Sequence, residues 1–240
     1  MEKQYKAVFF DLGGTLRIAF LEEAYMRHAR RKMAEIAGTD MPYEEFYQMI
    51  EERYEPYRKW ALGEFKESGD EELWCKWLLP DYDPVRIRQG CHELSFPYRQ
   101  CKGRREVVDG GVEVIKGLHE RGYKLGIISN LIGENEVPDW LEEDGLDSYF
   151  DTVILSSVCH MRKPCSEIYD LACQQIGVKP EECVSVADNI KRDIAGAKKA
   201  GIGCNIIFRS PEKKHPVEFT EENRPDYVIE DFREILNILP

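Results

Sequence analysis

The chain lacks a long hydrophobic run, and this absence limits where the protein can act. No segment approaches the roughly 20 apolar residues that a helix needs to cross a bilayer. The first apolar run is too short for a secretory signal and leads directly into a predicted strand. Basic residues are also in deficit, since 33 Lys and Arg face 45 Asp and Glu, for a net charge of −12. Because such a surface repels phosphate backbones and anionic lipids, we expect a cytoplasmic protein with no nucleic-acid and no membrane partner.

Regular cysteine and histidine motifs are missing as well. The eight cysteines include no CxxC pair, and the five histidines form no HExxH or HxH pattern. With no export signal, we expect reduced thiols rather than disulfides. We interpret the histidines as surface or packing residues and expect no zinc site.

The composition supports a large core, because 42% of the 240 residues are hydrophobic. Residues 17–106 show no convincing strand and hold 14 of the 26 aromatic residues, which we assign mainly to the core of a small helical bundle. Phe46, Ile50 and Tyr54 recur at a four-residue spacing typical of a helix, which we expect Pro56 to interrupt. The basic cluster at 27–32 is typical of an exposed helix face.

From about residue 107, short apolar runs alternate with helical patterns. Strands that alternate with helices predict a parallel sheet covered on both faces. We therefore predict an α/β fold with a doubly wound, mostly parallel, Rossmann-like sheet. The predicted core domain comprises residues 1–16 and 107–240, and residues 17–106 form an inserted helical domain. Residues 211–216, with the sequence PEKKHP, are predicted to form a solvated loop.

Polar residues follow the predicted strands at the positions where open α/β sheets bind ligands. These candidate site residues are Asp11, Ser129, Asn130, Lys163, Asp188 and Asp193. Carboxylate oxygens suit Mg²⁺, while Lys163 and Ser129 suit the oxygens of a phosphoryl group, aided by predicted helix N-termini after Asn130 and Asn189. A carboxylate beside a neutralised phosphoryl group can attack phosphorus as a nucleophile.

Four segments, "FFDLGGTL", "IISN", "RKP" and "VADNIKRDIAGAKKAG", occur in this order along the chain. Their order and approximate spacing resemble the four motifs of the haloacid dehalogenase-like (HAD) hydrolases. The insert at 17–106 resembles the helical cap of that family in its position and helical character. The resemblance implies a Mg²⁺-dependent phosphatase that acts on a small phosphorylated metabolite through an aspartyl-phosphate.

The resemblance also implies a role for each candidate residue. Asp11 is expected to be the nucleophile and a metal ligand, and Ser129 and Asn130 to bind the phosphoryl group. Lys163 is expected to steady Asp11 and the phosphate charge. The remaining expected metal ligands are Asp188, Asp193 and the backbone carbonyl of Gly13, while Thr15 is expected to brace the loop.

Gly13 is where the chain departs from the family pattern. Most phosphatases of the family carry a second aspartate at this position, which protonates the leaving group and then activates water. Glycine can do neither. The early residues of the insert, Glu22, Glu23, Tyr25 and His28, are candidates for a substitute acid or base, whereas Arg17 is predicted to be solvated.

Two alternatives stay open on the sequence alone. The glycine is compatible with a HAD-like protein that binds Mg²⁺ and phosphate but turns over slowly. It is also compatible with a dehalogenase-like or phosphonate-cleaving hydrolase, because those branches lack the second aspartate too. A phosphonate-cleaving enzyme would need a lysine in the insert, for which Lys59, Lys66 and Lys76 are candidates by location.

Overall fold

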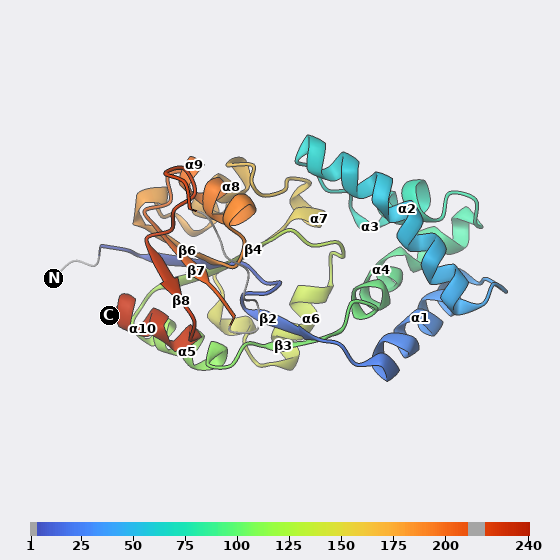
Figure 1. Ribbon diagram of the computed structural model, residues 1–240, viewed down its shortest axis with the longest axis horizontal. Coiled ribbons are helices and arrows are strands. Elements are labelled where there is room, and N and C mark those ends of the chain that lie inside the picture. Colours follow the sequence, from blue (N-terminus) through green and yellow to red (C-terminus); the bar gives the residue numbers. More distant parts are fainter. Residues whose placement is uncertain (1–3, 211–218) are drawn as a thin grey trace.

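The computed structural model describes residues 4–210 and 219–240, so the predicted loop at 211–216 lies outside the described residues. Two parts are visible in Figure 1: a sheet with its helices, where both termini lie, and a group of helices built from residues 23–100. Within the described residues, no helix combines the length and apolarity that crossing a membrane requires. All eight cysteines are free thiols.

The central sheet has six strands in the spatial order β5-β4-β1-β6-β7-β8. All neighbouring strands in it run parallel, which confirms the predicted α/β fold class. The strands are β1 (Ala7–Phe10), β4 (Lys124–Ser129), β5 (Thr152–Leu155), β6 (Cys183–Ala187), β7 (Cys204–Phe208) and β8 (Tyr227–Ile229).

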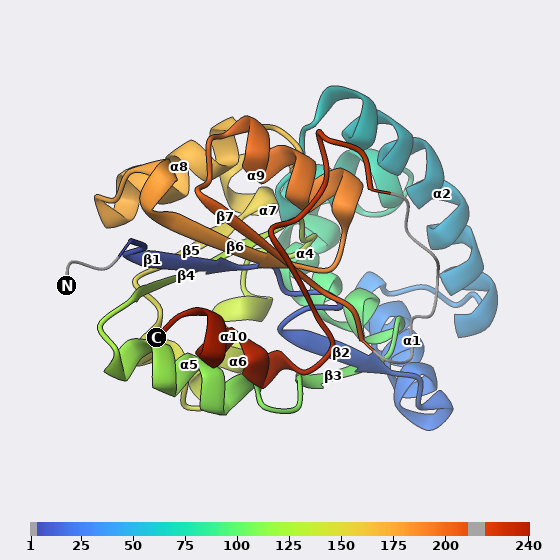
Figure 2. The same cartoon turned by 60° about the vertical axis from the view of Figure 1, so that its left-hand side comes forward.

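Helices cover both faces of this sheet, as the alternation of side chains along β1 requires. Val8 and Phe10 belong to one buried cluster, whereas Ala7 and Phe9 belong to another on the opposite face. Figure 2 shows α5 (Gly111–Glu120), α6 (Glu136–Glu143) and α10 (Ile235–Ile238) below the sheet. The same view shows α7 (Ser156–Cys159), α8 (Glu167–Ile176) and α9 (Ala195–Lys199) above it.

The helical region, residues 23–100, has a hydrophobic core of its own. Its helices are α1 (Glu23–Ala37), α2 (Tyr43–Glu64), α3 (Asp70–Glu72), which continues into a π-helical turn over Leu73–Leu78, and α4 (Pro84–Gln100). Met33, Phe46, Ile50 and Trp74 are fully buried within this core. The aromatic residues of this segment therefore do largely serve packing.

The expected interruption of α2 at Pro56 is wrong. The helix continues through this proline to Glu64. A proline inside a helix costs about 3 kcal/mol, but burying each large apolar side chain contributes about 1.5–3 kcal/mol. Ile50 and Tyr57, on either side of Pro56, are both fully buried. Their packing outweighs the local penalty.

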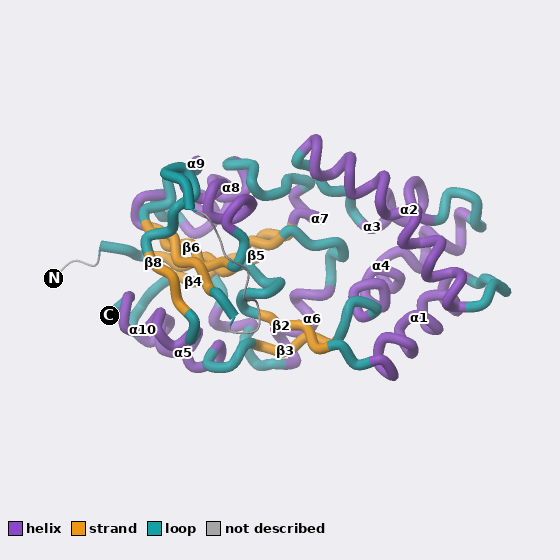
Figure 3. Tube along the Cα trace, viewed as in Figure 1, coloured by secondary structure: helices purple, strands orange, loops and turns teal. Residues whose placement is uncertain are grey.

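The prediction that residues 17–106 contain no strand fails at both ends of that segment. β2 (Arg17–Phe20) pairs antiparallel with β3 (Arg104–Val107), and Figure 3 shows this two-stranded ribbon between the sheet and the helical region. The two strands are remote in sequence, each has only four residues, and β3 is polar, so the sequence offers no clear strand pattern.

The prediction that Arg17 is solvated is wrong. Its Nη2 donates a hydrogen bond to the Arg105 carbonyl at 2.8 Å, and its guanidinium lies 4.4 Å from the Trp140 ring centre. Burial lowers the pKa of the Arg17 guanidinium below its ordinary value. The side chain thus stabilises the ribbon against α6.

Candidate active site

Three neighbouring strands end at the same edge of the sheet and bring polar residues there. Phe10 of β1 pairs with Ile127 of β4 and with Val186 of β6. Asp11 directly follows β1, Ser129 is the last residue of β4, and Asp188 directly follows β6. Parallel pairing in this register accounts for their meeting at the carboxyl ends of the strands.

Lys163 lies at the centre of this edge and is only 2% exposed. Its Nζ donates a hydrogen bond to Asp11 Oδ1 at 2.6 Å and to the Ile128 carbonyl at 2.7 Å. The same ammonium forms an ion pair with Asp193 Oδ1 at 2.7 Å. Two buried carboxylates and a carbonyl therefore fix one buried cation.

Asn130 and Thr15 hold the loops around this pair. The Asn130 side chain donates to the Lys163 carbonyl at 2.9 Å and accepts from the Lys163 backbone N–H at 2.8 Å. Thr15 Oγ1 donates to Asp11 Oδ2 at 3.4 Å. Ser129 is buried at the end of β4, but among the described residues its side chain takes no part in these hydrogen bonds and ion pairs.

The three aspartates converge, since oxygens of Asp11, Asp188 and Asp193 lie within 4.8 Å of one another. Asp11 and Asp193 are almost fully buried. Burial raises the pKa of the Asp11 carboxyl, although Lys163 opposes that shift. Burial acts in the same direction on Asp193, but Lys163 and Arg192 more than offset it and hold the pKa of that carboxyl below its ordinary value. This difference gives neighbouring carboxyls distinct proton affinities.

Gly13 and Gly14 follow Asp11 and have different roles in the backbone. Gly14 has a φ of 85°, which strongly favours glycine. An added Cβ at Gly13, by contrast, would meet no atom within 4 Å. The glycine at position 13 therefore leaves open space beside Asp11 that a larger side chain would fit.

Arg192 is a site residue that the sequence analysis missed. Its Nη2 lies 2.9 Å from Asp193 Oδ2, 3.4 Å from Asp11 Oδ2 and 3.7 Å from Asp188 Oδ1. Burial alone would lower the pKa of this guanidinium, but the three carboxylates raise it above its ordinary value. The four-residue spacing from Asp188 to Arg192, typical of an ion pair along a helical turn, was the available signal.

A buried ion pair between Glu67 and Arg162 joins the helical region to the loop that carries Lys163. Glu67 also accepts hydrogen bonds from Tyr57 and Ser156, and its backbone N–H donates to the His160 carbonyl. This segment of the helical region therefore lies directly against the residue that precedes Lys163.

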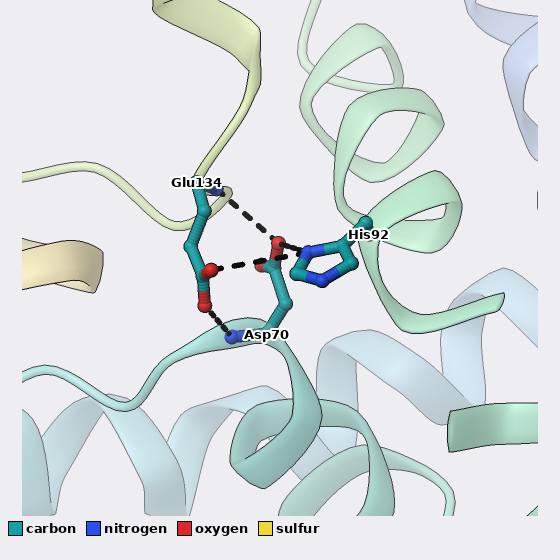
Figure 4. A group of neighbouring side chains, drawn as sticks. All are labelled: Asp70, His92 and Glu134. Atoms are coloured by element: carbon teal, nitrogen blue, oxygen red, sulfur yellow. Dashed lines mark hydrogen bonds and ion pairs between the residues drawn. The ribbon is translucent and has the colours of Figure 1, made fainter. Parts of the chain in front are cut away.

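A second junction lies beside the loop that follows Asn130, and Figure 4 shows its three side chains. The Glu134 carboxylate accepts a hydrogen bond from the Asp70 backbone N–H at 2.8 Å, and the Asp70 carboxylate accepts one from the Glu134 backbone N–H at 3.2 Å. His92 Nδ1 lies 2.9 Å from Asp70 Oδ2, and Ser95 Oγ donates to Asp70 Oδ1 at 2.5 Å. These contacts satisfy both oxygens of the buried Asp70 carboxylate, so the cluster fastens the loop at Glu134 to the helical region.

The other candidate residues take no part in these contacts. Among the described hydrogen bonds and ion pairs, none links Asp11 to the proposed substitute acids and bases or to the three candidate lysines. Glu22 pairs with Arg104, and Tyr25 accepts a hydrogen bond from Gln100. Lys76 pairs with Glu72, while the exposed Lys66 lines a cavity of about 970 Å³. The remaining members of this group, all exposed, are Glu23, His28 and Lys59.

Comparison with known proteins identifies relatives over the full length. The chain is 29% identical over 242 residues to the glyceraldehyde 3-phosphate phosphatase of Methanopyrus kandleri. The aligned region covers 98% of this chain and 97% of that protein. The 2-haloacid dehalogenase of Pseudomonas syringae shares the fold with a TM-score of 0.70 at 21% identity, covering 98% of both chains. YfnB from Bacillus subtilis, solved bound to magnesium, has a TM-score of 0.62 at 21% identity and covers 99% of both chains.

The family profile described as haloacid dehalogenase-like hydrolase matches residues 5–201 of this chain. This span contains the edge of the sheet at which Asp11, Lys163 and Asp188 meet, and all of the helical region. The chain belongs to the haloacid dehalogenase-like hydrolases.

Proposed function

We propose that the protein is a Mg²⁺-dependent phosphatase that hydrolyses a small phosphorylated metabolite through an aspartyl-phosphate on Asp11. The observation that carries this proposal is the buried Asp11–Lys163 pair with Asp188 and Asp193 close beside it. The relative from Methanopyrus kandleri, named for its action on glyceraldehyde 3-phosphate, supports this substrate class.

The donor set fits magnesium. Mg²⁺ prefers hard oxygen ligands, and the oxygens of three aspartates lie within 4.8 Å of one another here. We propose that Asp11, Asp188, Asp193 and the Gly13 carbonyl hold the ion, and the magnesium-bound YfnB supports this choice of metal. When bound, the ion would neutralise charge on the phosphoryl oxygens and so favour attack by an anion.

The residues of the chain itself then have separable tasks. An Asp11 carboxylate oxygen attacks phosphorus, the bond from phosphorus to the leaving oxygen breaks, and that oxygen takes a proton from water. Water next attacks the phosphorus of the aspartyl-phosphate and the bond from phosphorus to the Asp11 oxygen breaks, which releases inorganic phosphate and restores Asp11. A proton of this water neutralises the hydroxide left by the first step. Lys163 holds Asp11 in position and offsets charge on the phosphoryl group, which Ser129 and Asn130 also bind.

We also propose that residues 17–106 act as a cap domain over the core formed by residues 1–16 and 107–240. The helical region has its own hydrophobic core and joins the sheet part through the β2–β3 ribbon. It further contacts the loops after Asn130 and before Lys163 through Glu134 and Arg162. A cap in this position would select the substrate beside the nucleophile.

Phosphate release from glyceraldehyde 3-phosphate and a panel of sugar phosphates tests the proposal. We expect activity with Mg²⁺, loss of activity with EDTA, and no activity in Asp11→Asn. Asp147→Asn is the matched control, because Asp147 lies on the surface away from the site. Unchanged turnover in a pure, folded Asp11→Asn preparation would refute the assignment of Asp11.

Single turnover in water labelled with heavy oxygen separates this proposal from a dehalogenase-like reaction. A phosphatase of this kind places the heavy oxygen in the released phosphate, because water attacks phosphorus. Hydrolysis of a carbon ester on Asp11 would instead place it in the Asp11 carboxylate, since water attacks the carboxyl carbon. Mass spectrometry of the phosphate and of the peptide that contains Asp11 distinguishes the two results.

Gly13 favours one second candidate, a protein that binds Mg²⁺ and phosphate but turns over very slowly. Positioned acid–base catalysis is typically worth about 10²–10⁴ in rate, and no acid or base stands at this position. Binding of Mg²⁺ and beryllium fluoride without turnover across the substrate panel would favour this candidate over the phosphatase.

A further inference from the structure

The Arg192 guanidinium occupies the space between the three carboxylates. One of its nitrogens, Nη2, is within 3.7 Å of oxygens from Asp11, Asp188 and Asp193. The same three residues are those that we propose as metal ligands. A magnesium ion needs ligand oxygens at about 2.0–2.1 Å, so the guanidinium and the ion compete for the same oxygens.

The charges at the site differ in how firmly they are held. Among the described residues, Lys163 and Arg192 are cations that pair with the carboxylates of Asp11, Asp188 and Asp193. The Lys163 side chain is 2% exposed and is fixed by a backbone carbonyl as well as by carboxylates. The Arg192 side chain is 32% exposed. Arg192 is therefore the cation that can leave toward solvent.

From this arrangement we infer that Arg192 is an internal counter-ion that a divalent cation must displace. Without metal, the guanidinium limits repulsion among the three carboxylates and keeps them together. When the ion enters, its two positive charges replace that function and the hydrogen bonds from Arg192 to the carboxylates break. Arg192 therefore weakens the affinity of the site for Mg²⁺ while it stabilises the metal-free fold. This inference rests on the proposed metal site.

Calorimetric titration of Mg²⁺ into wild type and Arg192→Ala tests the inference without any measurement of turnover. We expect Arg192→Ala to bind Mg²⁺ about ten- to hundredfold more tightly, because a hydrogen bond to a charged group contributes about 1.5–3 kcal/mol. We also expect metal-free Arg192→Ala to melt at a lower temperature than wild type and to gain more from Mg²⁺. Lys191→Ala is the matched control, because Lys191 is exposed and its substitution removes the same charge.

Arg192→Gln is a second variant in case Arg192→Ala fails to fold, because the glutamine amide retains some of the contacts to the carboxylates. Equal or weaker Mg²⁺ binding in folded Arg192→Ala or Arg192→Gln, relative to Lys191→Ala, would overturn the inference and leave the phosphatase proposal intact. Absence of Mg²⁺ binding in the wild type and in every variant would overturn both.

Discussion

Restoring a carboxylate at position 13 tests whether the missing acid/base limits this enzyme. The structure accommodates the change, because a Cβ at Gly13 meets no atom within 4 Å and its φ lies outside the left-handed region. Substituting glycine at a compatible backbone position stabilises a protein by about 0.4–1 kcal/mol. We therefore expect Gly13→Asp to fold, so that an altered rate reports catalysis.

The expected gain depends on the leaving group. General acid catalysis is typically worth about 10²–10⁴, which corresponds to about 3–5 kcal/mol in the activation free energy. The leaving group of an alkyl phosphate such as glyceraldehyde 3-phosphate is a basic alkoxide, so its departure needs this proton. The p-nitrophenolate ion is a weak base and does not. Gly13→Asp should therefore raise kcat/KM for the alkyl ester and change it little for p-nitrophenyl phosphate.

The assay compares kcat/KM for both esters, since this constant reports the steps through cleavage of the bond to the leaving oxygen. Gly13→Asn is the matched control, because it has nearly the same size without a carboxyl group, and Gly13→Ala isolates the backbone effect. The reasoning is refuted if Gly13→Asn accelerates the alkyl ester as much as Gly13→Asp. It is also refuted if folded, Mg²⁺-binding Gly13→Asp gains nothing.

Three further predictions concern stability and are checked by urea unfolding. Pro56→Ala should raise the free energy of unfolding by about 1–3 kcal/mol, because Pro56 is an exposed proline inside α2; a decrease would contradict this. Gly126→Ala should lower it by about 1–3 kcal/mol, because the new Cβ would lie 2.7 Å from the Phe9 ring; a neutral result would contradict this. The hydrogen bond to Asp70 raises the pKa of His92 in the folded protein. The pair therefore stabilises the folded state in full below the unfolded pKa of about 6.5, and this stabilisation is lost as pH rises through the folded pKa. Wild type should have a free energy of unfolding higher than that of His92→Gln by less than about 1 kcal/mol, because His92 is half-exposed. This difference should shrink toward alkaline pH, and a constant difference would count against the ion pair.

The strand ends of the sheet were predictable, because each gives a local signal. Buried parallel strands are continuous apolar runs, and the residues that follow them, such as Asp11 and Asp188, are conspicuous polar residues. The β2–β3 ribbon gave no such signal, since its pairing partners are remote in sequence and each strand has only four residues. Pairing between remote segments is a property of the folded chain, and no periodicity encodes it.

The cations of the site were only partly predictable for a related reason. Lys163 stands in a loop motif that draws attention to it, but Arg192 lies within a helical turn beside other charged residues and resembles a solvated surface group. Its contacts arise because the chain after Asp188 begins a π-helical turn, Ile190–Ile194, with Asp193 buried inside it. That turn brings Arg192 over the carboxylates.

One short segment of the helical region, residues 65–70, contacts the loops on both sides of Asp11. Glu67 in this segment forms an ion pair with Arg162, which precedes Lys163. Asp70 is hydrogen-bonded to Glu134 in the loop that follows Asn130. Breaking a buried ion pair by removing one partner costs about 3–5 kcal/mol, so the helical region cannot lose these contacts without disturbing the loops on both sides of Asp11. The residues that would select the substrate and those that would perform the chemistry are therefore held by the same few side chains.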